Sequence, residues 1–226
     1  MGRKTVRTEP SDGETRQGLS KCKTVFLWCG VLVLLQAIRF GLKEAAYCFV
    51  PQTTDDHLVS MCVLPLMTVG MVLIAKRLGL SAEIFPKTRK RLYLIMGVIA
   101  VALFLSGALL FGAGDLGMLR DAVYGSLVIP VFEETIFRGY LWESLKGKFE
   151  QEWQVYLITT VLFSLWHFGY VDSLIIRIGI DGLGYVMLMK AFVGLVYGII
   201  VGFVRYRTKN TYAAMLVHSV MNTFGR

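Results

Sequence analysis

The sequence predicts an all-α, polytopic membrane protein built as a bundle of transmembrane helices. Of its 226 residues, 55% are hydrophobic and only 18% are charged, and its mean hydropathy is +0.58. The apolar residues gather in uninterrupted runs, and a helix of about 20 apolar residues is enough to cross a bilayer. No long polar linker divides the chain, so we expect a single helical domain.

About seven apolar runs are expected to cross the membrane, and the pattern also allows six or eight. The expected spans are 24–40, 58–75, 92–111, 121–142, 153–170, 184–204 and 211–224. Residues 1–23 are polar and basic and have no periodic apolar face, which indicates a disordered N-terminal tail. The transmembrane domain is therefore expected to comprise residues 24–226.

The basic residues indicate orientation in the membrane and not nucleic-acid binding, although the net charge is +8. They lie in short runs beside the apolar segments. If the N-terminus is cytoplasmic, the cytoplasmic segments hold 17 Lys and Arg residues, and the opposite face holds only Lys43, Arg120, Arg177 and Arg226. This asymmetry follows the positive-inside rule and favours a cytoplasmic N-terminus.

The expected span 121–142 carries three ionisable residues, Glu133, Glu134 and Arg138. Ionisable groups at membrane depth are expensive, and they usually mark functional sites. A helix turns about 100° per residue, so Glu134 and Arg138 are about 40° apart and one turn separated, close enough to pair. Glu133 points about 140° away from Arg138 and has no partner in its own helix. A purely structural ion pair is the alternative for Glu134 and Arg138.

Two further apolar segments carry polar residues at helical spacing. His167 follows Phe163 by one turn, and Asn222 follows His218 by one turn. Counted from the cytoplasmic ends at about 1.5 Å per residue, Glu133 lies roughly 13 Å deep, His167 roughly 20 Å, His218 roughly 12 Å and Asn222 roughly 18 Å. One carboxylate, two imidazoles and one carboxamide therefore share a layer about 8 Å thick. These groups can activate a water molecule and stabilise an oxyanion.

The three motifs are Glu-Glu-x-x-x-Arg, Phe-x-x-x-His and His-x-x-x-Asn, in this order and on separate apolar segments. Together they resemble the CAAX-protease and bacteriocin-processing family of intramembrane endopeptidases, which includes the type II CAAX prenyl endopeptidases. The resemblance covers roughly residues 120–224. It implies a glutamate-dependent protease that uses neither a metal nor another cofactor.

The resemblance also implies a role for each matching residue. The catalytic positions are Glu133, His167, His218 and Asn222. The first two would hold and deprotonate a water molecule, and the last two would stabilise the tetrahedral oxyanion. The supporting positions are Glu134, Arg138 and Phe163.

Other functions stay open at this point. A zinc-dependent hydrolase could use Glu133, His167 and His218 as ligands, although no His-Glu-x-x-His motif is present. A non-enzymatic immunity or regulatory partner could use the same polar residues to hold helices together. A transporter is less favoured because the chain has no repeated halves. For the protease, we expect a peptide or membrane-protein substrate, prenylated or a peptide precursor, in the lipid bilayer of a bacterial plasma membrane, on family analogy alone.

Overall fold

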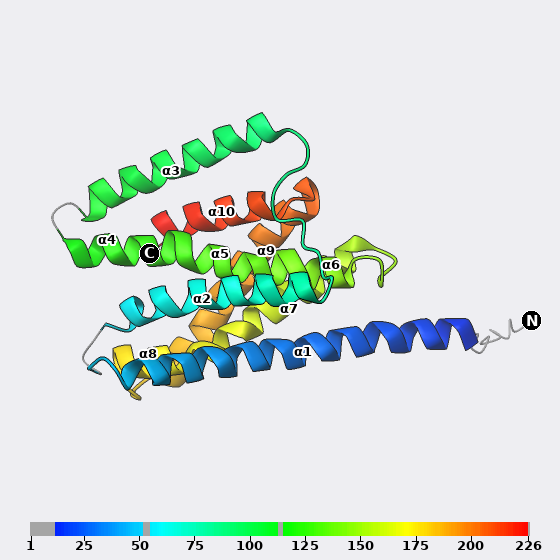
Figure 1. The fold of residues 1–226 in the computed structure, drawn as a ribbon, viewed down its shortest axis with the longest axis horizontal. Coiled ribbons are helices and arrows are strands. Elements are labelled where there is room, and N and C mark those ends of the chain that lie inside the picture. Colours follow the sequence, from blue (N-terminus) through cyan, green and yellow to red (C-terminus); the bar gives the residue numbers. More distant parts are fainter. Residues whose placement is uncertain (1–11, 52–54, 113–114, 226) are drawn as a thin grey trace, which may run out of the picture.

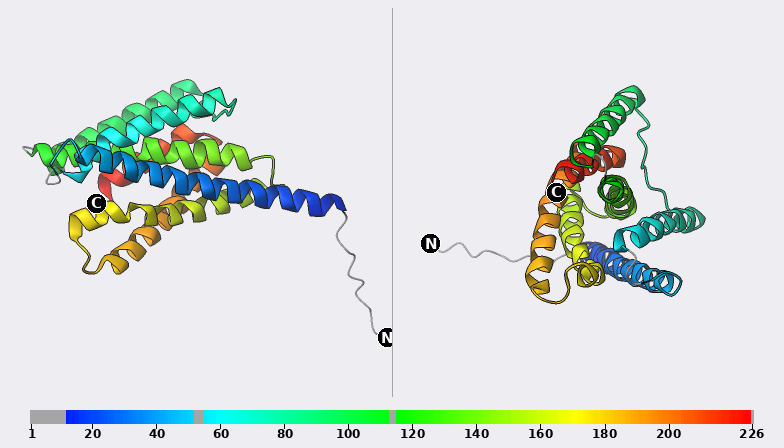
Figure 2. Two further views of the ribbon diagram at one scale, coloured as in Figure 1. Left: turned by 60° about the horizontal axis from the view of Figure 1, so that its bottom comes forward. Right: turned by 90° about the vertical axis from the view of Figure 1, so that its left-hand side faces the viewer.

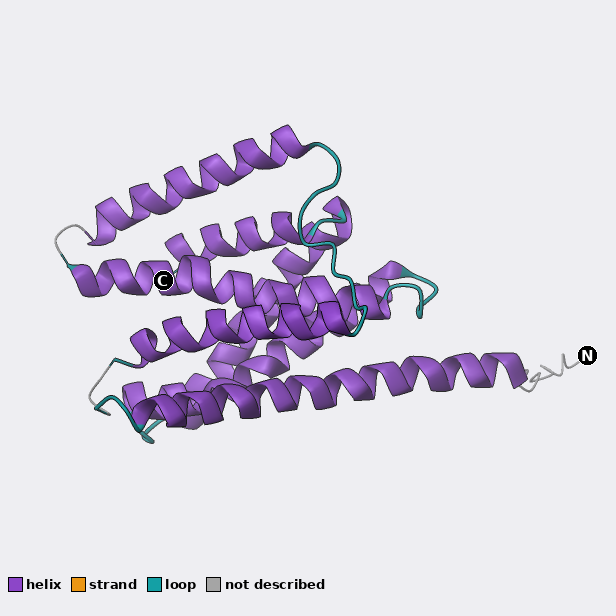
Figure 3. Ribbon diagram, viewed as in Figure 1, coloured by secondary structure: helices purple, strands orange, loops and turns teal. Residues whose placement is uncertain are grey.

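The computed structural model describes residues 12–51, 55–112 and 115–225, and these residues form helices joined by short loops (Figures 1 and 3). The described part contains no β-strand, which confirms the all-α prediction. The long helices run side by side, and the N-terminal end of α1 lies at the opposite end of the bundle from the C-terminus (Figure 1).

Three long helices form the first half of the chain: α1 (Asp12–Tyr47), α2 (Asp56–Arg77) and α3 (Lys90–Gly112). Asp55 caps α2, because its carboxylate accepts a hydrogen bond from the backbone N–H of His57. Helix α1 begins at Asp12, so residues 12–23 are helical, whereas the sequence predicts a tail there. Residues 1–11 of the predicted tail lie outside the described residues.

A continuous helical run from Leu116 to Leu145 carries the acidic cluster. It consists of α4 (Leu116–Val123), the π-helix η1 (Tyr124–Val128), α5 (Ile129–Glu134), the π-helix η2 (Thr135–Leu141) and α6 (Trp142–Leu145). The two π-helical turns flank the α5 segment that ends with both glutamates. Such wide turns are rare in proteins and occur frequently at functional sites.

Proline chemistry explains a free carbonyl at the first π-helical turn. The N–H of Ile129 donates to the carbonyl of Tyr124, five residues back. The matching donor for the carbonyl of Gly125 would be residue 130, which is Pro130 and has no N–H. The Gly125 carbonyl is therefore available to a side chain from another helix.

The second half of the chain folds into α7 (Glu152–Trp166), the 3₁₀-helix η3 (His167–Tyr170), α8 (Val171–Ile178), α9 (Leu183–Thr208) and α10 (Thr211–Phe224). In the further views, α8 and the start of α9 form a hairpin at the end of the bundle where the C-terminus lies (Figure 2). The fifth expected span thus continues beyond Tyr170, through η3 into α8.

The number of membrane crossings stays a prediction. Within the described residues, five helical segments are long and apolar enough to cross a membrane. The run from Leu116 to Leu145, which carries the charged cluster, is not among them. Helix α10 has 14 residues, a length of about 21 Å, which is shorter than the hydrocarbon core of about 30 Å.

A row of glycines brings α9 against α7. Gly194, Gly198 and Gly202 are four residues apart, and a methyl group added to any of them would come within 3.2 Å of an α7 side chain or of His167 just beyond it. Small residues at this spacing let membrane helices approach closely, because little hydrophobic force acts between helices in lipid. The close approach places His167 directly against Gly194.

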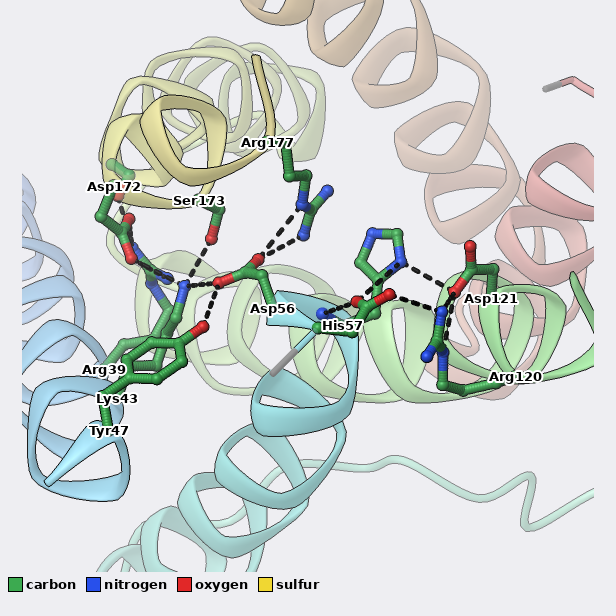
Figure 4. A network of polar contacts seen from close by, with 12 residues as sticks. Arg39, Lys43, Tyr47, Asp56, His57, Arg120, Asp121, Asp172, Ser173 and Arg177 are labelled. Carbon is green, nitrogen blue, oxygen red and sulfur yellow. Dashed lines mark hydrogen bonds and ion pairs between the residues drawn. The ribbon is translucent and has the colours of Figure 1, made fainter. Parts of the chain in front are cut away.

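An ion network joins α1, α2 and α8 (Figure 4), and it comprises Arg39, Lys43, Asp56, Asp172 and Arg177. Lys43 Nζ lies 2.5 Å from Asp56 and 2.9 Å from Asp172. Arg39 pairs with Asp172, and Arg177 lies 2.6 Å from Asp56. Asp56 and Asp172 thus each form ion pairs with two cations, and these ion pairs join α8 to α1 and α2.

Replacing Asp172 with Asn should destabilise the bundle by about 3–5 kcal/mol, because Arg39 and Lys43 would stay buried without that carboxylate. Thermal unfolding of the purified protein in detergent measures the loss. The control is Asp181→Asn, since Asp181 is exposed and forms no ion pair with any described residue. Equal melting temperatures for the two variants would contradict the structural role of the network.

Candidate active site

A cavity of about 180 Å³ lies between α5, η3, α8, α9 and α10, and four residues that line it are Glu133, His167, His218 and Asn222. These are the four residues for which the sequence suggests catalytic roles. They come from three different elements, α5, η3 and α10, so the tertiary fold brings them together. A water molecule occupies about 30 Å³ in the liquid, so the cavity has room for a few waters or a small part of a substrate.

Glu133 is 1% exposed, and its two oxygens differ in their surroundings. The hydroxyl of Tyr170 donates a 2.7 Å hydrogen bond to Oε1. Oε2 has no hydrogen-bond partner among the described residues. One oxygen is therefore anchored, and the other is left for a water molecule or a ligand. The absence of a partner within its own helix agrees with the helical geometry of the sequence.

Tyr170 is a site residue that sequence reasoning missed. At the end of an expected span, it has the position of an interfacial aromatic anchor. In the structure it is 8% exposed, lines the cavity and bonds to Glu133. A signal for it could have been its spacing of three residues from His167, which places both in the short helix η3.

His167 is the first residue of η3, and its ring orientation is set by the backbone. Its Nδ1 lies 2.8 Å from the carbonyl oxygen of Phe163. Because a carbonyl oxygen only accepts hydrogen bonds, Nδ1 carries the proton and donates it. In the neutral imidazole, Nε2 therefore carries the lone pair and can accept a proton from water.

Glu134 contacts two hydrogen-bond donors, Arg138 and His218, through one carboxylate oxygen. It is completely buried, and its Oε1 lies 3.2 Å from Arg138 Nη1 and 2.8 Å from His218 Nδ1. The pair with Arg138 is the one that helical spacing predicts. The bond to His218 joins α5 to α10, and no feature of the sequence indicates it. A carboxylate on Nδ1 orients the imidazole and leaves Nε2 for the cavity.

Asn222 is fixed by the carbonyl that the first π-helical turn leaves free. Its Nδ2 donates a 2.7 Å hydrogen bond to the oxygen of Gly125. An Asn amide nitrogen has two hydrogens, so one more can be donated to a ligand. The sequence position of Pro130 thus helps to set the position of an amide 92 residues later.

Phe163 lies at the centre of the site and is fully buried. Its ring meets the rings of His167 and His218 edge to face, with centroids 4.9 Å and 6.0 Å away. The guanidinium of Arg138 lies 4.4 Å from the centroid of the same ring, a cation–π contact. Phe163 therefore packs against both imidazoles and the buried ion pair, as a supporting residue would.

The arrangement does not favour a shared zinc ion. Within the described residues, one group of acidic and histidine side chains has ligand atoms within 4.8 Å of one another: Asp55, His57 and Asp121. Glu133, His167 and His218 do not form such a group. In the group that does, Arg120 bonds both carboxylates and so occupies the place of a cation.

The described residues form a helical bundle with apolar, membrane-length helices and an internal cavity lined by polar side chains, which defines the class of an integral membrane protein. Residues 115–224 match the family described as type II CAAX prenyl endopeptidase Rce1-like. This match covers the three motifs and confirms the resemblance seen in them. No curated protein and no solved structure matches the chain.

Replacing Gly194 with Ala should displace the ring of His167, because the added methyl would lie 2.6 Å from its Nδ1. Overpacking of this kind costs about 1–3 kcal/mol, so the melting temperature in detergent should fall. The matched control on the same helix is Gly184→Ala, where nothing lies within 4 Å of the added methyl. Equal melting temperatures for the two variants would contradict the close contact between α9 and His167.

Proposed function

We propose that the protein is a metal-independent, glutamate-type intramembrane endopeptidase that uses a water molecule held between Glu133 and His167. The observation that supports this most directly is the unpartnered Oε2 of a buried glutamate in a cavity that it shares with His167. A buried polar atom without a partner calls for an explanation, and a bound nucleophilic water supplies one.

In the proposed reaction, the water lies between the Glu133 carboxylate and Nε2 of His167. These groups take one proton from the water as its oxygen attacks the carbonyl carbon of the peptide bond. The product is a tetrahedral intermediate with a negatively charged oxygen. The captured proton then passes to the leaving nitrogen, the C–N bond breaks, and a carboxylic acid and an amine are released.

The oxyanion would be stabilised from the other side of the cavity. Asn222 can donate its second amide hydrogen, since the first is used by Gly125. His218 can donate from Nε2 as an imidazolium, with its positive charge balanced by the carboxylate of Glu134 at Nδ1. Donors that are already oriented before the reaction stabilise a developing negative charge most effectively in a site that excludes water.

Supporting roles follow from the contacts. Arg138 shares Glu134 with His218 and also donates to the carbonyl of Gly198, 3.1 Å away on α9. It thereby pairs with the second glutamate and fixes it between two helices. Tyr170 does the equivalent for Glu133, by holding Oε1 so that Oε2 faces the water.

The substrate that we propose is a peptide or membrane protein that reaches the cavity within the bilayer, either prenylated or a peptide precursor. The match of residues 115–224 to the type II CAAX prenyl endopeptidase family supports a CAAX-type protein substrate. The bacterial plasma membrane as its location rests on family analogy.

Glu133→Gln, His167→Ala and His218→Ala should each lower peptide cleavage by about 10²-fold or more, because each removes a proton acceptor or an oxyanion donor. Purified variants in detergent are assayed with prenylated and unprenylated fluorogenic peptides, and their amounts in the membrane are compared. The control is Glu44→Gln, an exposed glutamate at the far end of α1. A Glu133→Gln variant with its full biological effect would favour the non-enzymatic membrane partner.

Chelation separates the glutamate mechanism from the zinc alternative. Treatment with EDTA or phenanthroline should leave the cleavage rate of the purified protein unchanged, because the proposed water is activated by side chains alone. Loss of activity that is restored by added zinc would contradict the proposal. Metal analysis of the same preparation provides the independent check.

A further inference from the structure

Lys190 is a charged residue in the cavity wall that the proposed reaction does not use. It lies on α9, lines the same cavity as Glu133, and places its ammonium 5.3 Å from the ring centroid of Tyr170. Among the described residues, Lys190 forms no hydrogen bond and no carboxylate lies within 4 Å of its Nζ. A lysine at membrane depth usually pairs with an anion or lines a functional cavity.

The ion network beside the cavity adds to this positive charge. Arg177 belongs to the network and also lines the cavity. Within the network, three cations share only two carboxylates (Figure 4). When Lys190 and Glu133 are included, one positive charge is still without a carboxylate. In surroundings of low dielectric constant this excess attracts an anion strongly.

The nearby acidic cluster does not cancel this excess. Asp55 and Asp121 have side chains 44% and 34% exposed, and both already pair with Arg120. Charges in such exposed positions are screened by solvent and contribute little at a distance. The uncompensated charge therefore stays with the cavity end that is formed by α8 and α9.

A further hydrogen-bond donor is available at the same end. Ser173 lines the cavity, and its oxygen accepts a 2.7 Å hydrogen bond from Lys43. Its own hydroxyl hydrogen is therefore left for another acceptor. An ammonium and a hydroxyl, both with hydrogens to donate, suit a group that only accepts hydrogen bonds, and an ionised carboxylate is such a group.

We propose that Lys190, with Ser173 and the positive charge of Arg177, forms a subsite that binds a carboxylate of the peptide substrate. The inference rests on the proposed protease function and names a chemical feature of its substrate. Tyr170 links the subsite to the reaction, because its hydroxyl bonds to Glu133 while its ring carries the ammonium of Lys190. A carboxylate on Lys190 would thus lie one aromatic side chain away from the reacting water, which favours a group on the peptide itself.

The test compares matched peptides that differ by one carboxylate. One pair differs only at the C-terminus, as the free acid and the amide. A second pair has an amidated C-terminus and differs by Glu or Gln near the cleaved bond. Wild-type protein should cleave the acid member of one pair about 10- to 100-fold more efficiently in kcat/KM, since a hydrogen bond to a charged group has about this effect. The pair that shows the preference identifies the source of the carboxylate.

Lys190→Met and Lys190→Gln should remove this preference by raising KM for the acid peptide, with the amide peptide almost unchanged. Lys190→Arg keeps the charge and should retain much of the preference. Lys148→Met is the control, because it removes the same charge from an exposed loop. These comparisons are ratios within one protein, so they do not depend on how much of each variant folds.

Three results would overturn the inference. The first is a wild-type protein without preference within either pair. The second is an equal loss for acid and amide peptides in the Lys190 variants, which indicates a structural role. The third is a dependence on anionic over zwitterionic lipid vesicles that the variants abolish while they keep the acid preference, which assigns Lys190 to a lipid phosphate. Failure of the proposed protease function gives a different result from failure of the subsite. In that case Glu133→Gln would not differ from wild type in the cleavage of any peptide.

Discussion

The buried carboxylate of Glu134 joins the two sides of the site, because one oxygen accepts hydrogen bonds from both Arg138 and His218. Glu134 and Arg138 are completely buried, and removing either would leave the other buried without its ion-pair partner, which is strongly destabilising. Arg138 in turn reaches the carbonyl of Gly198 on α9. Three helices are thereby held in one arrangement, and the position of His218 relative to Glu133 follows from it.

Irregular helix geometry supplies the other attachments. Wide π-helical turns leave carbonyl groups without their usual partners in the same helix. The carbonyl of Gly125 then accepts from Asn222, and the carbonyl of Arg138 accepts from Arg205 and Thr211. Polar side chains of α9 and α10 are thus anchored on the helix that carries the glutamates. In an apolar environment each such bond also satisfies a backbone group that would otherwise be costly.

The helices before the family segment also contribute to the site. Gln36 of α1 donates to the carbonyl of Trp166, and Arg39 donates to the carbonyl of Gly169. The guanidinium of Arg39 also lies 4.9 Å from the ring centroid of Tyr170. Helix α1 therefore holds the short helix η3, which carries His167 and Tyr170. The match to residues 115–224 contains the proposed catalytic groups but not all the groups that position them.

The sequence by itself determined the helical class, the apolar segments, the three polar motifs and the pairing of Glu134 with Arg138. Hydropathy and helical spacing are local properties, so residues within about four positions of one another suffice to read them. Only the tertiary structure decided that Tyr170 bonds to Glu133, that Glu134 also holds His218, and that Lys190 lines the cavity. These contacts join different helices, and they depend on helix rotation and separation, which here are set by the glycines of α9 and by ion pairs between distant residues.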